Sequence, residues 1–271
     1  MRHLLAVLFL APIALLAQEN PNYDPDYNGD GCFTATDLLG LLPLFGGCVD
    51  TVPAFACGDS TLFDNYWYKT VLIGDQCWFA ENLRTTTYRN GDAIPAGLTD
   101  GDWSSTTSGA TAVYGEGSSD CYNYSPDIDA CDETQSMAEY GRLYNWYAVD
   151  DARSLCPSGW HVPTDGEWTD LENHISSQGF SGAEGNALKS TYGWDNGGNG
   201  TDDFGFSALP GGLRISYGDF FGAGDFGLWW SSSPSGGNAW LRVLEYLSSG
   251  IFRENYVPRF GFSVRCLRDA E

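Results

Sequence analysis

Strand-like segments rich in aromatic and β-branched residues alternate with turns of Gly, Asp and Asn along much of the chain. Residues 66–73 are followed by Gly74-Asp75 and then by residues 77–79, a pattern that predicts a β-hairpin. Further strands are predicted nearer the end of the chain at 211–215, 228–232, 239–244 and 260–266. Because few segments have helical spacing, we expect strands and ordered loops to dominate.

The clearest helix signal begins at Thr164. Thr164 and Glu167 form a capping box, in which each side chain accepts a hydrogen bond from a backbone amide that the helix leaves free. Its apolar face continues at Trp168, Leu171 and Ile175. A second segment with helix-like spacing covers 140–151.

Composition points in the same direction. Of 271 residues, 34 are Gly, aromatic residues reach 15% and charged residues only 18%. Such chains favour strands and long loops over helices. Residues 97–135, rich in Gly, Ser, Thr and Asp, are predicted to be a long surface loop, and 193–205 is a further Gly-rich stretch.

The net charge excludes two classes of partner. Asp and Glu number 36 and Lys and Arg 13, which gives a formal charge of −23. Nucleic acids and anionic membranes are bound through clustered Lys and Arg, so we expect neither as a partner. Only Lys69 and Lys189 are lysines.

The first residues predict export. An apolar run at 4–16 follows Arg2 and His3, and Ala17 precedes the polar Gln18. The run is too short for a transmembrane helix, which needs about 20 residues, but fits a signal peptide over 1–17. We expect a soluble mature chain without membrane insertion, located outside the cell, on its surface or in the periplasm.

Eight cysteines in an exported chain predict disulfide bonds. The 105 possible pairings stay open from sequence alone. Sequence neighbours favour Cys32–Cys48 and Cys121–Cys131, each closing a short loop. Cys156–Cys266 would close a long loop, which leaves Cys57–Cys77.

Residues 26–37 match a twelve-residue calcium loop. Short oxygen-bearing side chains stand at alternating positions, Gly31 supplies the sharp turn, and Ca²⁺ prefers oxygen ligands. The predicted ligands are Asp26, Asn28, Asp30, the Cys32 carbonyl, Thr34 and Asp37. The loop and the short leucine-rich helix after it resemble one dockerin repeat. A full dockerin carries two repeats, so cohesin is a doubtful partner here.

The chain therefore divides into a signal peptide at 1–17, a dockerin-like loop–helix unit at 18–48, a linker at 49–56 and a large domain at 57–271. Five motifs of the large domain occur in a set order: VLIGDQCWFAENLR at 71–84, YGRLYNWYA at 140–148, CPSGWHVPT at 156–164, GTDDFGFSALPGG at 200–212 and GFSVRC at 261–266. Together they resemble the Fibrobacter succinogenes major paralogous domain, a family without an established activity.

At greater distance the domain resembles the C-type lectin-like fold and the related fold of the formylglycine-generating enzyme. The resemblance implies an α+β fold with small antiparallel sheets, few helices and long ordered loops. It also implies the pair Cys156–Cys266, because in the lectin-like fold a cysteine near the first helices pairs with one on the final strand.

Lectin-like folds often place calcium and sugar in a long loop, which makes Asp195, Asn199, Asp202 and Asp203 candidates for a second calcium or ligand site. A solvated turn is the alternative. Exposed aromatic rings could stack on sugars, and the candidates are Trp194, Trp229, Trp230 and Trp240. Strand alternation predicts one buried and one exposed ring for Trp229-Trp230.

We expect an exported, calcium-stabilised, non-catalytic binding or adhesion module that recognises polysaccharide or a surface protein. One alternative is an enzyme on a formylglycine-generating-enzyme-like scaffold, whose chemistry needs two reactive cysteines close together and which free thiols at Cys156 or Cys266 would favour. The other is a purely structural domain.

Overall fold

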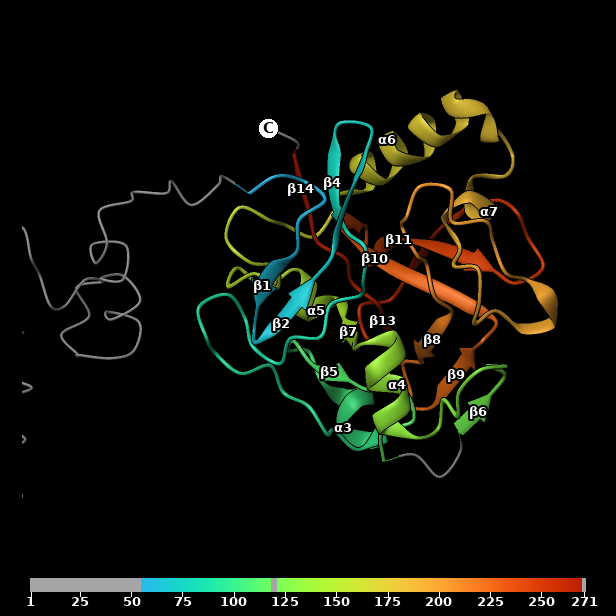
Figure 1. Ribbon diagram of the computed structural model, residues 1–271. Helices are drawn as coiled ribbons and strands as arrows, with labels where there is room; N and C mark the ends of the chain where they lie inside the picture. Colours follow the sequence, from blue (N-terminus) through green and yellow to red (C-terminus); the bar gives the residue numbers. More distant parts are fainter. Residues whose placement is uncertain (1–54, 118–120, 270–271) are drawn as a thin grey trace, which may run out of the picture. The chain divides into compact units, whose positions relative to one another are not determined.

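The computed structural model describes residues 55–117 and 121–269. Their strands form four sheets, joined by short helices and long loops, so this part of the chain has a mixed α+β fold in which strands predominate (Figure 1). The signal peptide, the calcium loop and the pair Cys32–Cys48 lie outside the described residues and stay predictions. None of the helices in the described ranges has both the length and the apolar character needed to cross a membrane.

The predicted hairpin is confirmed. β3 (Thr70–Ile73) pairs antiparallel with β4 (Gln76–Phe79), and Ile73 lies opposite Gln76 across the turn. The other edge of β4 pairs with β14 (Leu267–Asp269), so the last described strand lies beside one of the first. β1 (Thr61–Phe63) and β2 (Tyr66–Tyr68) form a separate two-stranded sheet.

A six-stranded sheet has the order β5-β7-β13-β8-β9-β6. Its strands are β5 (Thr111–Ala112), β6 (Cys121–Asn123), β7 (Leu143–Asn145), β8 (Gly211–Arg214), β9 (Phe220–Ala223) and β13 (Gly261–Phe262). Neighbours are antiparallel except β6 and β9, which run parallel.

The longest strands belong to a three-stranded antiparallel sheet of β10 (Phe226–Ser235), β11 (Asn238–Glu245) and β12 (Phe252–Tyr256). Helix α6 (Asp165–Ile175) contacts β10 and β11 (Figure 1). Its capping box forms as predicted, with the Thr164 hydroxyl accepting from the Glu167 amide and the Glu167 carboxylate accepting from the Thr164 amide.

The remaining helical elements are α3 (Asp100–Ser105), α4 (Glu133–Tyr140), α5 (Trp146–Val149), α7 (Glu184–Leu188), the π-helical turn η2 (Ser176–Phe180) and the 3₁₀ turn η3 (Asp195–Gly197).

Three element predictions were wrong. Residues 97–135 are not one loop: α3, β5 and β6 lie within them, and Thr99 and Asp132 cap helices α3 and α4. The segment 140–151 is not one helix, because Gly141, with a positive φ of 72°, follows the end of α4 and a strand intervenes before the single turn of α5. The predicted strand at 260–266 is reduced to β13, followed by irregular chain that leads into β14.

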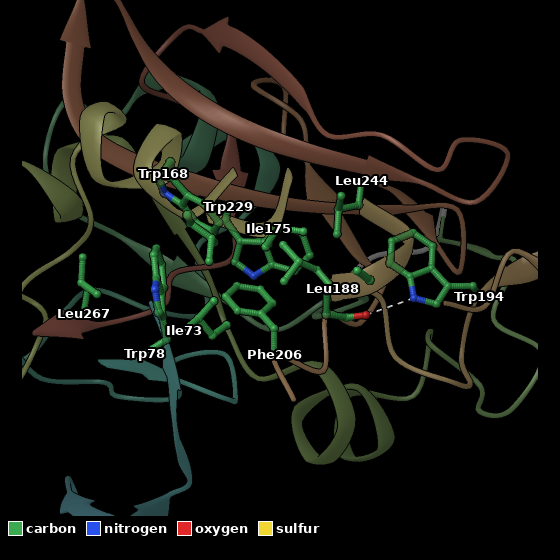
Figure 2. Packing of buried hydrophobic residues seen from close by; sticks show 13 residues of the cluster. Ile73, Trp78, Trp168, Ile175, Leu188, Trp194, Phe206, Trp229, Leu244 and Leu267 are labelled. Atoms are coloured by element: carbon green, nitrogen blue, oxygen red, sulfur yellow. Dashed lines mark hydrogen bonds between the residues drawn. The ribbon is translucent and has the colours of Figure 1, made fainter. Parts of the chain in front are cut away.

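Aromatic rings fill the larger core cluster, which lies between α6, the β3–β4 hairpin and β10 (Figure 2). Trp78 packs against Trp168 with ring centroids 4.8 Å apart, and Phe206 contacts both rings edge to face. The buried members of this cluster are Ile73, Trp78, Trp168, Leu171, Ile175, Ala187, Leu188, Trp194, Phe206, Ala208, Trp229, Leu244 and Leu267.

Three of the four tryptophans predicted to stack on a ligand belong to the interior, which corrects that prediction. Trp194 and Trp229 are 1% exposed and Trp230 is 0% exposed. Their indole nitrogens donate to Ala208 O, Asn82 Oδ1 and Tyr144 O, at 3.0, 2.8 and 2.8 Å. The prediction of one buried and one exposed ring at Trp229-Trp230 was wrong because both faces of β10 are covered. Trp229 packs in the larger core cluster and Trp230 packs against Phe262.

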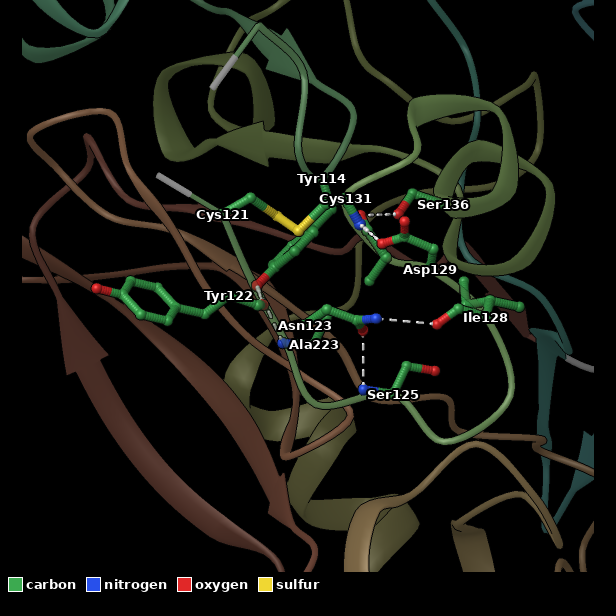
Figure 3. The surroundings of a disulfide bond; sticks show 11 residues. Tyr114, Cys121, Tyr122, Asn123, Ser125, Ile128, Asp129, Cys131, Ser136 and Ala223 are labelled. Atoms are coloured by element: carbon green, nitrogen blue, oxygen red, sulfur yellow. Dashed lines mark hydrogen bonds between the residues drawn. A yellow bond between two sulfur atoms is a disulfide. The ribbon is translucent and has the colours of Figure 1, made fainter. Parts of the chain in front are cut away.

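Three of the four predicted disulfide bonds lie within the described residues, and all three form: Cys57–Cys77, Cys121–Cys131 and Cys156–Cys266. Figure 3 shows the loop closed by Cys121–Cys131, where Asn123 and Asp129 side chains bond nearby backbone groups. Tyr114 donates its hydroxyl hydrogen to Tyr122 O at 2.6 Å beneath this loop. The loop is therefore fixed by polar contacts and a covalent bond, rather than by apolar packing alone.

Candidate functional site

The loop predicted to hold a second calcium ion does not gather its oxygens. Asn199 Oδ1 accepts from the Trp194 amide at 3.0 Å, and both Asp202 oxygens accept from Ser207 at 2.7 Å. Asp195 and Asp203 each accept from a neighbouring side chain of the loop, Asn196 and Thr201. In the described ranges, no three His, Cys, Asp or Glu side chains are grouped so that they could hold a metal ion.

Lys189 stabilises the Gly-rich loop at 193–205 through hydrogen bonds to backbone carbonyls. Lys189 is 1% exposed, and its ammonium group donates to Glu245 O at 2.6 Å, Ser248 O at 2.7 Å and Gly198 O at 3.3 Å. The ammonium also lies 4.8 Å from the Trp194 ring centroid. Burial lowers the pKa of Lys189 to about 8, although the Glu245 charge acts in the opposite direction. The three carbonyls join the loop to the region around the end of β11.

A polar cleft opens where β2, the chain after β4, helix α4 and the loop before β8 meet. Its volume is about 350 Å³. The lining residues are Tyr66, Trp67, Lys69, Ala80, Glu81, Asn82, Arg84, Ala138, Glu139, Tyr192, Ser207, Leu209 and Arg265. Aromatic, amide and charged groups therefore meet in one concave surface, the arrangement expected of a site for a polar ligand.

Trp67 is the most exposed aromatic residue of the polar cleft. Its side chain is 62% exposed, whereas its strand neighbour Tyr68 is completely buried. The alternation of β2 explains this difference, because successive side chains of a strand point to opposite faces. Tyr192, 48% exposed, adds a second accessible ring from the loop after α7. Burial raises the pKa of Tyr192 to about 12, and the Glu139 carboxylate adds to this shift.

Glu81 and Arg84 are fixed by the fold. The Tyr66 hydroxyl donates to Glu81 Oε2, and the Lys69 amide donates to Glu81 Oε1 at 3.2 Å. Burial and this Glu81 bond raise the pKa of Tyr66. Arg84 donates to Met137 O and, at 3.0 Å, to Ala138 O, carbonyls of the last turn of α4, where the helix itself supplies no amide partner.

Arg265 places a buried cation at the polar cleft. It is 1% exposed and donates to Asn82 Oδ1 at 3.1 Å, Ser207 O at 2.9 Å and Phe206 O. These partners are uncharged, and Arg265 forms no ion pair with any described carboxylate. Burial lowers the pKa of Arg265 to about 9, while the charges of Asp202 and Glu81 act in the opposite direction.

Two polar atoms of the cleft walls are left without a hydrogen bond. Arg84 Nε and Glu139 Oε1 are buried and have no partner within the described part of the chain. Unpaired buried polar groups cost free energy in a folded protein. Both atoms are buried from solvent, so they weaken the packing of the cleft walls without being open to a ligand.

An aromatic groove of about 440 Å³ lies elsewhere, over the β10–β12 sheet and strands β8 and β9. It is lined by Leu213, Phe221, Phe226, Leu228, Val243, Glu245, Phe252, Glu254, Tyr256, Phe260 and Phe262. Its walls carry mainly Phe and aliphatic side chains, with two carboxylates. This groove offers far fewer hydrogen-bonding groups to a sugar than the polar cleft.

The sequence model of the Fibrobacter succinogenes major domain matches residues 71–268 of this chain. The chain belongs to this family. No curated protein and no solved structure matches it. Most of the polar cleft lies within the family segment, but Tyr66, Trp67 and Lys69 precede it.

Sequence reasoning missed the polar cleft and its two exposed rings. Of the predicted stacking residues, only Trp240 is partly exposed, and the Arg253 guanidinium lies 3.4 Å from its ring centroid. Trp67 could have been found from alternation within Tyr66-Trp67-Tyr68, which places the central ring opposite its neighbours. Tyr192 gave no comparable signal, since it lies in an irregular loop.

Proposed function

We propose that the chain is an exported, non-catalytic binding module that recognises polysaccharide through the polar cleft. The observation that carries this proposal is the exposed Trp67 ring at a cleft whose charged groups are held in place by hydrogen bonds. An aromatic face packs against the C–H face of a sugar ring, while amide and carboxylate groups bond its hydroxyls.

The disulfide between Cys156 and Cys266 supports a non-catalytic function. Both residues are buried, at 1% and 0% exposure, and chemistry of the formylglycine-generating type would need two reactive thiols. The exposed Trp67 favours ligand binding over a purely structural function, because an isolated structural domain gains nothing from an accessible ring at a polar cleft. A surface protein is the second candidate partner, favoured by the aromatic groove.

The proposal extends to the fold and to the region before the large domain. A C-type lectin-like arrangement is supported by the bridge from Cys156, which precedes capped helix α6, to Cys266, which directly precedes β14. For residues 26–37 we propose Ca²⁺ binding by one dockerin-like loop, which a calcium titration of the mature chain tests.

Affinity electrophoresis of the mature protein tests polysaccharide binding. The gels contain xylan, mixed-linkage β-glucan or pectate. We expect retardation in at least one gel and a loss of about tenfold in affinity for Trp67→Ala, because an aromatic contact is removed. Tyr217→Ala is the matched control, since Tyr217 is 73% exposed and lies outside the cleft lining. Equal retardation of wild type and Trp67→Ala, or no retardation in any gel, would contradict the proposal.

A further inference from the structure

The polar cleft has the opposite charge balance to the rest of the chain. Its lining includes three cationic side chains, Lys69, Arg84 and Arg265, and two carboxylates, Glu81 and Glu139. The whole chain has 13 Lys and Arg against 36 Asp and Glu. A locally cationic surface in so acidic a protein points to a ligand that carries negative charge.

The hydrogen bonds show which charge is available. Glu81 is occupied by Tyr66 and by the Lys69 amide, and an Arg84 nitrogen lies 4.0 Å from it. The terminal nitrogens of Arg84 are occupied by helix carbonyls and its Nε is buried, while Arg265 is occupied by carbonyls and an amide oxygen. The Lys69 ammonium, in contrast, is on an exposed side chain and forms no ion pair among the described residues.

Lys69 lies two residues after Trp67 at the polar cleft. Residues 67 and 69 are exposed while 68 and 70 are buried, and Trp67 and Lys69 both line the polar cleft. Two residues of chain span at most roughly 7 Å, so these two side chains begin close together. That separation suits a pyranose ring stacked on Trp67 with its carboxylate directed to the Lys69 ammonium.

At physiological ionic strength, salt weakens the long-range repulsion between the acidic chain and an anionic polymer. The Debye length is then about 8 Å, so that distant carboxylates are screened. The side chains within the cleft decide the preference.

We infer that the polar cleft selects hexuronate residues, sugars that carry a ring carboxylate, through Trp67 and the Lys69 ammonium. This inference rests on the proposed function and adds the class of sugar. A neutral sugar could use the same ring but would leave the ammonium without a partner.

Isothermal titration calorimetry at about 0.15 M salt tests the inference with two ligands. One is oligogalacturonate and the other is the methyl ester of the same oligomer. The ester keeps the sugar ring and removes the negative charge. We expect the acid to bind about fivefold more tightly than the ester, the upper range for one exposed ion pair. Lys69→Met is expected to remove this preference and leave ester binding unchanged, whereas Lys69→Arg keeps it. Trp67→Ala is expected to weaken binding of both oligomers.

Equal affinity for acid and ester, or a preference that survives in Lys69→Met, would overturn the inference while the proposed polysaccharide binding stands. If neither oligomer binds but the electrophoresis retards the protein with a neutral polysaccharide, the hexuronate assignment alone is wrong. If no polysaccharide binds in either experiment, both proposals are wrong.

Discussion

The two lysines of this chain occupy regions with opposite properties. Lys189 is enclosed between the Gly-rich loop at 193–205 and the end of β11, where three carbonyl oxygens accept its hydrogens. Lys69 lies beside the polar cleft, exposed and without an ion pair in the described ranges. A buried cation whose donors are all used holds segments together, whereas an exposed cation with unused donors is available to a ligand.

Two arginines that share one carboxylate give the sharpest form of this comparison. Arg242 is 1% exposed and bonds Asp165 Oδ1 at 2.7 Å as well as Glu172. Arg253 bonds both Asp165 oxygens at 2.8 Å, yet its side chain is 44% exposed. The distances to Asp165 are nearly equal, but Arg242 is buried and also pairs with Glu172, whereas Arg253 is exposed and lies over the Trp240 ring. Both contacts hold the pKa of Asp165 below its ordinary value, and burial of Asp165 opposes them.

Arg242→Met is expected to have the largest effect. Removing the buried partner should lower the free energy of unfolding by about 3 kcal/mol, because Asp165 and Glu172 lose a desolvated counter-charge. Arg253→Met should cost less than about 1 kcal/mol, since water can replace an exposed partner. Urea denaturation of both variants measures the difference, and equal losses would contradict the larger contribution of the buried Arg242.

Lys189→Met should come next, with a loss of about 2–3 kcal/mol, because the carbonyls of Gly198, Glu245 and Ser248 lose their donor in a buried position. Lys69→Met should change stability by less than about 0.5 kcal/mol, as for most exposed substitutions. Thermal unfolding monitored by near-UV circular dichroism compares them. A similar loss in both variants would mean that Lys69 also has a structural role.

His161 is an intermediate case with a smaller, pH-dependent effect. His161 Nε2 lies 2.7 Å from Glu167 Oε1, and this bond raises the pKa of His161 above its ordinary value, opposed by burial. The stabilisation should be complete below about pH 6.5 and be lost as pH rises through the folded-state pKa. Since the His161 side chain is 43% exposed, we expect less than about 1 kcal/mol.

An NMR titration of the His161 ring, in wild type and in Glu167→Gln, measures this coupling directly. The pKa should be lower in the variant. His174→Gln, a change on helix α6 outside this pair, is the control and should leave the His161 titration in place. An unchanged His161 pKa in Glu167→Gln would show that the carboxylate is not the cause.

Sequence signals predicted local features well where one interaction type decides them. The Thr164–Glu167 capping box, the turn at Gly74-Asp75 and three cysteine pairs all formed as predicted. The prediction of a single loop at residues 97–135 was wrong because helix caps, a disulfide bond and pairing with distant strands give this segment its structure. None of these interactions produces a hydrophobic periodicity in the sequence. Tertiary contacts override weak local pattern in such segments.

The candidate site was harder to predict for the same reason. Whether a tryptophan is core or accessible depends on what covers its strand, and β10 is covered on both faces while β2 is an edge strand of a two-stranded sheet. The sequence could not show that Arg265 and Tyr192, far apart in the chain, line the same cleft as Trp67. The sequence also gave no indication that Lys189 is buried, since its ammonium donates to backbone carbonyls, which every residue type has.

The attachment of both ends of the domain to β4 has a mechanical consequence. The Cys57–Cys77 bond joins the beginning of the domain to β4, and β14 pairs with the same strand, with Arg268 opposite Cys77. Tension applied between the two ends would pass through the disulfide into β4 and leave through the ladder to β14. Tyr66, Trp67 and Lys69 lie inside the loop that this disulfide closes, so the pulling force bypasses them. The loop that carries these three side chains is therefore outside the path of tension between the two ends of the domain.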